Sequence, residues 1–309
     1  MKKGFITIAT GDERYYRMAR TLVRSYRKTS TNPMPFAIIC DRENEYTAEF
    51  DCVVLLGNPT FSWLDKIKLL ECCPYDENIF VDADCTIYND INFFWDLFKT
   101  ADDFSCFGKV LPMDSKEGWF TSDAARVYPI RFITHLHGIC YFIRPGEMVD
   151  RMVALSCDII RNYSAVQYKG FNDCLADEPV FALAMAILGL KPIEREPHYY
   201  CFVPYATHIN TNFYTREVDF RNPKDGWVRS CFIVHWGNQN TKRAQYRFDA
   251  HIINNMKNRN MSKVLSCLLF DRKLLLHMYR AQDLVHDWWS KIAWFVGRVW
   301  KKLREAGRE

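Results

Sequence analysis

The sequence predicts an α/β protein with a mostly parallel sheet, helices on both faces and a helical C-terminal tail. In the first hundred residues, short apolar runs alternate with segments of helical spacing, the pattern of consecutive strand–helix units. The composition of the 309-residue chain, with 49% hydrophobic and 25% charged residues, is that of a globular protein with ample core material. From about Lys242 onward the pattern is helical. We therefore expect an α/β domain over residues 1–258 and a helical tail over residues 259–309.

Four apolar runs of the first hundred residues are predicted strands, at 5–9, 36–40, 52–56 and 78–82. Residues 12–27 and 63–72 between them have the apolar spacing of helices. Later predicted elements are strands at 138–143 and 231–236 and helices at 146–161 and 174–188, with a polar loop around 113–123. Ligands of parallel sheets bind beyond the carboxyl ends of the strands. Functional residues are therefore expected directly after Ala9, Cys40 and Val81.

The twelve cysteines follow no disulfide or zinc-binding pattern. There is no Cys-x-x-Cys, and most cysteines, such as Cys85 and Cys140, lie in apolar runs where a thiol behaves as a small hydrophobic group. The first apolar stretch is too short for a secretory signal, and no run reaches the roughly 18 apolar residues of a membrane span. We therefore expect a reduced, cytoplasmic protein.

An Asp-x-Asp motif, Asp82-Ala83-Asp84, follows the fourth predicted strand. Two carboxylates spaced by one residue can reach one small volume, where they would hold a divalent cation that bridges phosphate oxygens. Short acidic pairs also arise by chance on solvated turns. Here, however, the pair follows a buried strand, where charge is costly without a positive partner. The motif therefore predicts a site for a metal and a diphosphate.

Five blocks, in order, resemble the GT-A-fold glycosyltransferases, and most closely the family 8-like enzymes. Residues 8–12 resemble the nucleotide-binding first strand, and residues 66–70 with 74–84 resemble the segment that leads to the metal motif. Residues 137–142 resemble the strand under the donor sugar, and residues 177–179 resemble an Asp-Gln-Asp helix start. Residues 233–237 with Lys242 resemble a His-x-x-Gly-x-x-Lys closing loop. The resemblance spans roughly residues 4–245 and leaves the tail outside. It implies a GT-A fold, a UDP-sugar donor, Mn²⁺ or Mg²⁺, and a saccharide or lipid-linked saccharide acceptor, with retention of anomeric configuration.

The resemblance assigns the metal to Asp82, Asp84 and His235. Two carboxylates and an imidazole suit Mn²⁺ better than Mg²⁺, which prefers oxygen ligands. A histidine after an apolar strand is ordinarily a core residue, but Gly237 and Lys242 follow His235, which adds a flexible loop and a cation that reaches phosphate. This loop is one residue longer than the family pattern.

The nucleotide is expected at the end of the first strand, against Ala9 and Thr10, with Tyr15 or Tyr16 stacked on the uracil. Packing of both tyrosines within the first helix is the alternative. Lys66 lies one helix before the metal motif, where a cation suits a diphosphate, although a solvated helix charge is the ordinary explanation.

Asp177 and Glu178 open a predicted helix, where acidic residues ordinarily act as caps. The resemblance makes Asp177 an acceptor for donor-sugar hydroxyls and places Glu178 opposite the anomeric carbon, with a covalent or ion-pair role open. His137 replaces the usual Asn beside Gly138, under the donor sugar. His135 shares a strand face with His137, and without a third ligand nearby the pair is expected to pack structurally.

Two other functions fit the sequence less well. A sugar nucleotidylyltransferase would need a glycine- and arginine-rich loop after the first strand, and residues 9–14 contain a single glycine. A non-catalytic glycan-binding protein is disfavoured by the joint presence of Asp82, Asp84 and His235. The absence of glycine-rich phosphate loops disfavours NAD enzymes and P-loop NTPases.

The tail, residues 283–309, repeats apolar residues at steps of three and four and carries four tryptophans and an excess of basic residues. A helix packed on the body or on a second subunit would explain the stripe. The aromatic and basic composition favours an anionic membrane surface, which would place the protein peripherally on the inner face of the cell membrane. The charge excess lies largely in this tail, and no nucleic-acid partner is expected.

Overall fold

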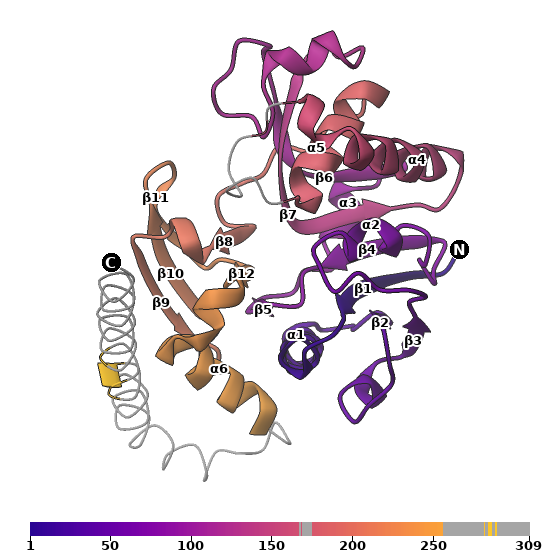
Figure 1. Cartoon of the computed structure of the whole chain (residues 1–309). Helices are drawn as coiled ribbons and strands as arrows, with labels where there is room; N and C mark the ends of the chain where they lie inside the picture. Colours follow the sequence, from indigo (N-terminus) through magenta and orange to yellow (C-terminus); the bar gives the residue numbers. More distant parts are fainter. Residues whose placement is uncertain (167, 169–174, 256–280, 282–283, 286–287, 289–309) are drawn as a thin grey trace, which may run out of the picture.

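The computed structural model describes residues 1–166, 168, 175–255, 281, 284, 285 and 288. Its centre is a six-stranded sheet with the order β3-β2-β1-β4-β7-β6 (Figure 1). The strands are β1 Lys3–Ala9, β2 Phe36–Cys40, β3 Cys52–Leu55, β4 Glu77–Val81, β6 Phe104–Leu111 and β7 Ile133–Ile143. β1 to β4 pair in parallel, whereas β7 is antiparallel to both of its neighbours. The predicted α/β class with a mostly parallel, helix-flanked sheet is confirmed.

Helices cover both faces of this sheet because its strands are apolar on both sides. These helices are α1 Glu13–Thr29, α2 Asp65–Leu69, α3 Phe94–Leu97, α4 Glu147–Arg161 and α5 Asp177–Leu188, whereas α6 Ala244–Asn255 packs against α1 and a smaller sheet. In β4, Ile79 and Val81 join a core cluster with α1 and α3, whereas Phe80 joins a second cluster with α2, α4 and α5. Continuous apolar strands of this kind are typical of parallel sheets.

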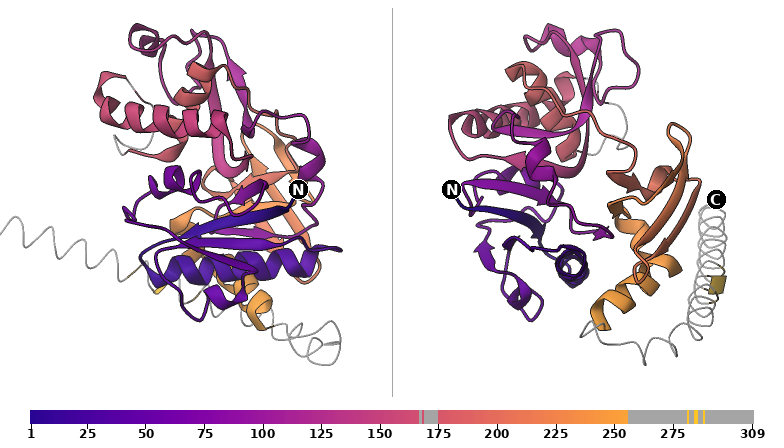
Figure 2. Two further views of the ribbon diagram at one scale, coloured as in Figure 1. Left: turned by 90° about the vertical axis from the view of Figure 1, so that its right-hand side faces the viewer. Right: turned by 180° about the vertical axis from the view of Figure 1, so that it is seen from behind.

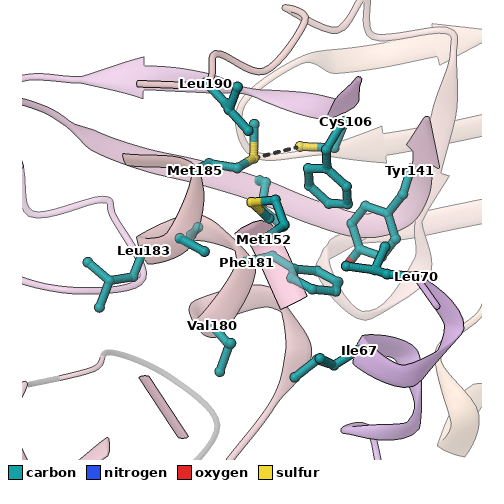
Figure 3. Packing of buried hydrophobic residues seen from close by; sticks show 14 of the residues in the cluster. Ile67, Leu70, Cys106, Tyr141, Met152, Val180, Phe181, Leu183, Met185 and Leu190 are labelled. Atoms are coloured by element: carbon teal, nitrogen blue, oxygen red, sulfur yellow. Dashed lines mark hydrogen bonds between the residues drawn. The ribbon is translucent and has the colours of Figure 1, made fainter. Parts of the chain in front are cut away.

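Helix α5 is the most apolar helix of the described chain and lies inside one of the core clusters. Nine of its twelve residues are buried. Figure 3 shows Phe181 and Met185 of this helix against Tyr141 and Cys106 of the sheet, with the two sulfur atoms 3.7 Å apart. The helix ends at Gly189, whose φ of 75° is the left-handed conformation that glycine adopts without strain, so the predicted helix end is confirmed.

Two small sheets lie beside the central sheet, and the sequence analysis largely missed them (Figures 1 and 2). One has the order β5-β12-β8 (Cys85–Ile87, Ile233–His235 and Tyr200–Phe202), and the other has the order β11-β10-β9 (Gly226–Arg229, Glu217–Asn222 and His208–Asn212). Their short strands give too little periodicity to be recognised. Asp249 of α6 ties them together, because its buried carboxylate accepts hydrogen bonds from Tyr88 Oη at 2.7 Å and Phe213 N at 3.1 Å.

The predicted boundary at residue 258 and most of the tail lie outside the described residues. Residues 281, 284, 285 and 288 are helical. None of the helices within the described ranges is long and apolar enough to cross a bilayer. The ten cysteines in these ranges are free thiols, and Cys40, Cys85, Cys140 and Cys231 are buried, as their apolar surroundings predicted.

Candidate functional site

The candidate site lies at the carboxyl ends of β1 and β4. The chain runs from β1 outward through β2 to β3 and then returns to place β4 on the other side of β1. Such a reversal opens a crevice between the two strands, which is where ligands of open α/β sheets bind. Thr10 follows β1 and Asp82 follows β4, so both lie at this switch point of the sheet. The connection from β3 to β4 carries α2 and Lys66 across it.

Lys66 joins two carboxylates from opposite sides of the site. Its Nζ lies 2.7 Å from Asp82 Oδ2 and 3.3 Å from Asp177 Oδ2, and its side chain is 12% exposed. Burial lowers the pKa of Lys66, but the charges of Asp177 and Asp82 outweigh burial and raise it above its usual value. Lys66 is therefore a protonated, paired cation, and the alternative of a solvated helix charge is wrong.

Asp84, Cys85 and His235 form the one group within the described ranges that could hold a metal ion. Their ligand atoms lie within 4.8 Å of one another. β12 pairs with β5 and places His235 opposite Cys85, which brings His235 Nε2 to 2.9 Å from Asp84 Oδ1. His235 Nε2 is also 3.8 Å from Asp82 Oδ2. The structure thus brings two of the predicted ligands, Asp84 and His235, together with Cys85, which had been assigned to packing although it directly follows the motif. The third predicted ligand, Asp82, lies beside this group and pairs with Lys66.

The chemistry of this group fits a divalent cation. Asp84 Oδ1 is buried and faces His235 Nε2 at 2.9 Å. A buried carboxylate is costly without a positive partner, and a metal ion between Asp84 and His235 would be such a partner. Burial lowers the pKa of His235, but the charge of Asp84 outweighs burial and raises it. Burial raises the pKa of the Cys85 thiol well above its usual value.

Glu178 and Asp177 project from the first turn of α5 toward β7. Glu178 Oε1 accepts a hydrogen bond from Gly138 N, and Asp177 Oδ2 accepts one from Tyr141 Oη at 2.7 Å. Asp177 therefore bonds to the sheet and is not the N-cap residue of the helix, which is Ala176. Burial, together with the charge of Asp177, raises the pKa of Glu178 to about 7. A carboxyl group near neutral pKa is suited to acid–base or nucleophilic work.

Gly138 allows this close approach of α5 to β7. A Cβ atom added at Gly138 would lie 3.0 Å from Glu178 Oε1 and 2.8 Å from Tyr141 Oη. A side chain at this position would force Tyr141 Oη, and to a smaller extent Glu178, to shift. The glycine therefore lets both side chains keep their places against the strand.

His137 and His135 lie on β7 beside the same site. Their ring centroids are 5.2 Å apart, and the His137 ring is 5.8 Å from that of Tyr200. Burial lowers the pKa of His135 to about 4 and that of His137 to about 3, so both rings are neutral. These contacts support the expected structural packing.

At the end of β1, hydrogen bonds link the crevice to the neighbouring strands. Thr10 Oγ1 donates to Asp65 Oδ2 at 2.9 Å, and Gly11 N donates to Asp41 Oδ1 at 2.8 Å. Tyr16 is buried and donates to Asp41 Oδ1 at 2.6 Å, so it packs within the fold. Asp41 directly follows Cys40, where a functional residue was expected, whereas no sequence pattern pointed to Asp65.

The closing loop begins at Gly237, whose φ of 66° favours glycine. The turn Asn238–Lys242 follows, and Asn238 Nδ2 donates to Tyr15 Oη at 3.1 Å. Tyr15 therefore lies where α1 meets this loop. Lys242 ends the turn, is exposed, and forms no ion pair with any residue in the described ranges.

No protein-family model matches the sequence, and a search of curated proteins finds no relative. The fold is similar to that of a galactosyltransferase, LgtC, solved with donor and acceptor sugar analogues, with a TM-score of 0.52 and 10% identity over 82% of this chain and 96% of that chain. The bifunctional glycosyltransferase WbbM has a TM-score of 0.48 and 10% identity over 82% of this chain and 50% of that chain. The glycosyltransferase GlyE of Streptococcus pneumoniae has a TM-score of 0.43 and 12% identity over 66% of this chain and 48% of that chain. The likeness to LgtC confirms the predicted glycosyltransferase fold.

Proposed function

We propose that this chain is a metal-dependent glycosyltransferase that moves a sugar from a UDP-sugar to a saccharide or lipid-linked saccharide acceptor. The observation that carries the proposal is the convergence of Asp84 and His235 on one small volume, 2.9 Å apart, with Asp82 and Lys66 beside them. A cation and a lysine at the same crevice suit the diphosphate of a nucleotide sugar.

Each residue of the site has a place in this reaction. Asp82, Asp84 and His235 would hold Mn²⁺, with Cys85 within reach, and the imidazole favours Mn²⁺ over Mg²⁺. When bound, the ion supplies positive charge for the diphosphate and for the departing UDP. Ala9, Thr10 and Tyr15 would line the nucleotide, and Gly237 and Lys242 belong to the loop that would close over the phosphates.

The donor sugar would lie against β7 and the start of α5. His137 and Gly138 provide the surface below it, and Asp177 would accept hydrogen bonds from its hydroxyl groups. Glu178 would face the anomeric carbon, where a carboxylate can act as a nucleophile or stabilise an oxocarbenium ion. We propose retention of configuration on this basis.

The first test is binding of UDP by isothermal calorimetry with and without Mn²⁺, followed by a screen of UDP- and GDP-sugars for metal-dependent slow hydrolysis. We expect Mn²⁺-dependent binding of UDP and hydrolysis of one UDP-sugar. A protein that binds no nucleotide would instead agree with a non-catalytic glycan-binding role. Formation of a nucleotide sugar from a sugar phosphate and a nucleoside triphosphate would identify a nucleotidylyltransferase.

The tail is proposed to hold the enzyme peripherally on the cytoplasmic face of the cell membrane, close to a lipid-linked acceptor. In the described part of the tail, Leu284, Val285 and Trp288 are 72%, 55% and 61% exposed. Exposed apolar residues among basic ones suit the interface of an anionic bilayer.

A further inference from the structure

The loop between β3 and α2 presents an exposed aromatic ring from a strained backbone. Phe61 has a φ of 54°, in the left-handed region that bulky residues rarely adopt. Two of the four non-glycine residues with positive φ in the described chain, Asn58 and Phe61, lie in this loop. The Phe61 residue is 62% exposed and belongs to none of the three core clusters. Packing of the core therefore does not account for the strain.

Hydrogen bonds to Asp65 stabilise this backbone conformation. Its buried carboxylate accepts hydrogen bonds from Phe61 N at 3.0 Å, Thr60 N at 2.6 Å and Thr60 Oγ1 at 2.8 Å. It also accepts the bond from Thr10 Oγ1 at 2.9 Å. One carboxylate thus fixes the loop to the end of β1. Strain that is over-determined in this way is typical of functional sites.

The Phe61 ring lies over the backbone that follows β1. A Cβ atom added at Gly11 would be 3.1 Å from Phe61 Cδ1. Lys66, on the same connection, reaches Asp82 at the end of β4. One segment therefore supplies an apolar, planar surface at β1 and a cation at β4, which match the base and the diphosphate ends of a nucleotide.

The tyrosines first expected to stack on the base are less available than Phe61. Tyr16 is fully buried and hydrogen-bonded to Asp41. The guanidinium of Arg14 lies 4.8 Å from the ring centroid of Tyr15 and occupies one face of that ring. Tyr15 Oη also accepts hydrogen bonds from Arg14 Nη2 and Asn238 Nδ2.

We propose that Phe61 is the platform on which the nucleobase of the donor stacks, an inference that rests on the proposed function. Stacking on an aromatic side chain is favourable for every base because each base has a π-face. Phe61 therefore contributes affinity, and the polar groups around Thr10 determine which base is preferred. Asp65 is then a positioning residue that keeps the ring exposed and oriented.

The test compares two ligands, UDP and inorganic pyrophosphate, in calorimetry with saturating Mn²⁺. Phe61→Ala should weaken UDP binding ten- to hundredfold and leave pyrophosphate binding unchanged, since pyrophosphate has no base. Phe61→Tyr should keep the affinity for UDP. Phe61→Asn, which tolerates the left-handed backbone, should lose UDP affinity as Phe61→Ala does while keeping the wild-type melting temperature.

The possible failures differ. In the first, the wild type binds UDP and pyrophosphate, and Phe61→Ala and Phe61→Asn bind UDP as tightly as the wild type does. This result would overturn the stacking role and leave the proposed function standing. Equal losses of UDP and pyrophosphate affinity in Phe61→Asn also overturn it, because the ring would then act on the diphosphate or the fold. Wild type that binds neither ligand with Mn²⁺ removes the proposed function and this inference together.

Discussion

His235 Nε2 and Asp84 Oδ1 lie 2.9 Å apart, at the end of β12 and directly before β5. The antiparallel pairing of these two short strands creates the contact. The charge of Asp84 raises the pKa of the imidazole. A metal ion would need the neutral imidazole as its ligand, so its binding should release protons and weaken at low pH.

The Asp84→Asn variant should lose Mn²⁺-dependent UDP binding, and its turnover should fall about 100-fold or more, because one charged ligand is removed from a small ligand set. Cooperative thermal unfolding should be retained. Calorimetry and donor-hydrolysis assays measure the effect. Asp96→Asn, on the exposed surface of α3, is the matched control and should behave as wild type. Unchanged turnover in Asp84→Asn would exclude this metal site.

Replacing Lys66 by Met should destabilise the protein by about 3 kcal/mol at pH 8, because the carboxylates of Asp82 and Asp177 lose their buried partner. Urea unfolding measures this change, and Lys2→Met at the exposed N-terminus is the control. Adding Asp177→Asn to Lys66→Met should recover part of the loss, since one unpaired charge is removed. A double variant no more stable than the single one would contradict the pairing.

Glu178→Gln should stabilise the metal-free protein at alkaline pH. The folded-state pKa of Glu178 is raised from 4.5 to about 7, so its stabilising contribution is complete below pH 4.5 and is lost as the pH rises through 7. Gln can keep the bond from Gly138 N without a charge. The variant should therefore match wild type near pH 4 and exceed it by about 2 kcal/mol at pH 8, since one pKa unit is worth about 1.4 kcal/mol and partial exposure reduces the effect. Denaturant unfolding at several pH values measures the difference, and a constant difference across this range would refute the raised pKa.

Transfer should proceed with retention, and Glu178→Ala should lower kcat much more than it lowers donor affinity. This expectation follows from the position of Glu178 at the start of α5, beside Gly138. Nuclear magnetic resonance of the first-formed product determines its anomeric configuration. An inverted product would reject both the family 8 likeness and the role of Glu178.

Truncation after Arg280 should leave donor hydrolysis intact, abolish binding to anionic vesicles and reduce activity on lipid-linked acceptors. Each basic residue near an anionic surface contributes on the order of 1 kcal/mol, so the effect should weaken as salt is added. Vesicle sedimentation with and without anionic lipid measures it. A full-length protein that ignores anionic vesicles at low salt would show that the tail has another role.

The sequence alone determined the four parallel strands of the sheet, the helices α1, α4 and α5 and the motif at the sheet edge, whereas β6 and α3 were not predicted. The apolar runs that became β1, β2, β3 and β4 are continuous and bounded by polar residues, so local chemistry was enough to place them. Asp82 and Asp84 could be assigned because they follow such a strand directly. Cys85 stands next to them and was missed, because a cysteine in an apolar run is ordinarily core.

Only the tertiary structure decided which distant residues meet. The short strands β5, β8 and β12 have no sequence period of their own, and their pairing alone sets His235 beside Asp84. Lys66 became a buried partner of Asp82 and Asp177 because the β3–β4 connection crosses the crevice. The left-handed backbone of Phe61 depends on the hydrogen bonds that Asp65 accepts there and at Thr10, and no local propensity predicts a conformation that long-range contacts impose.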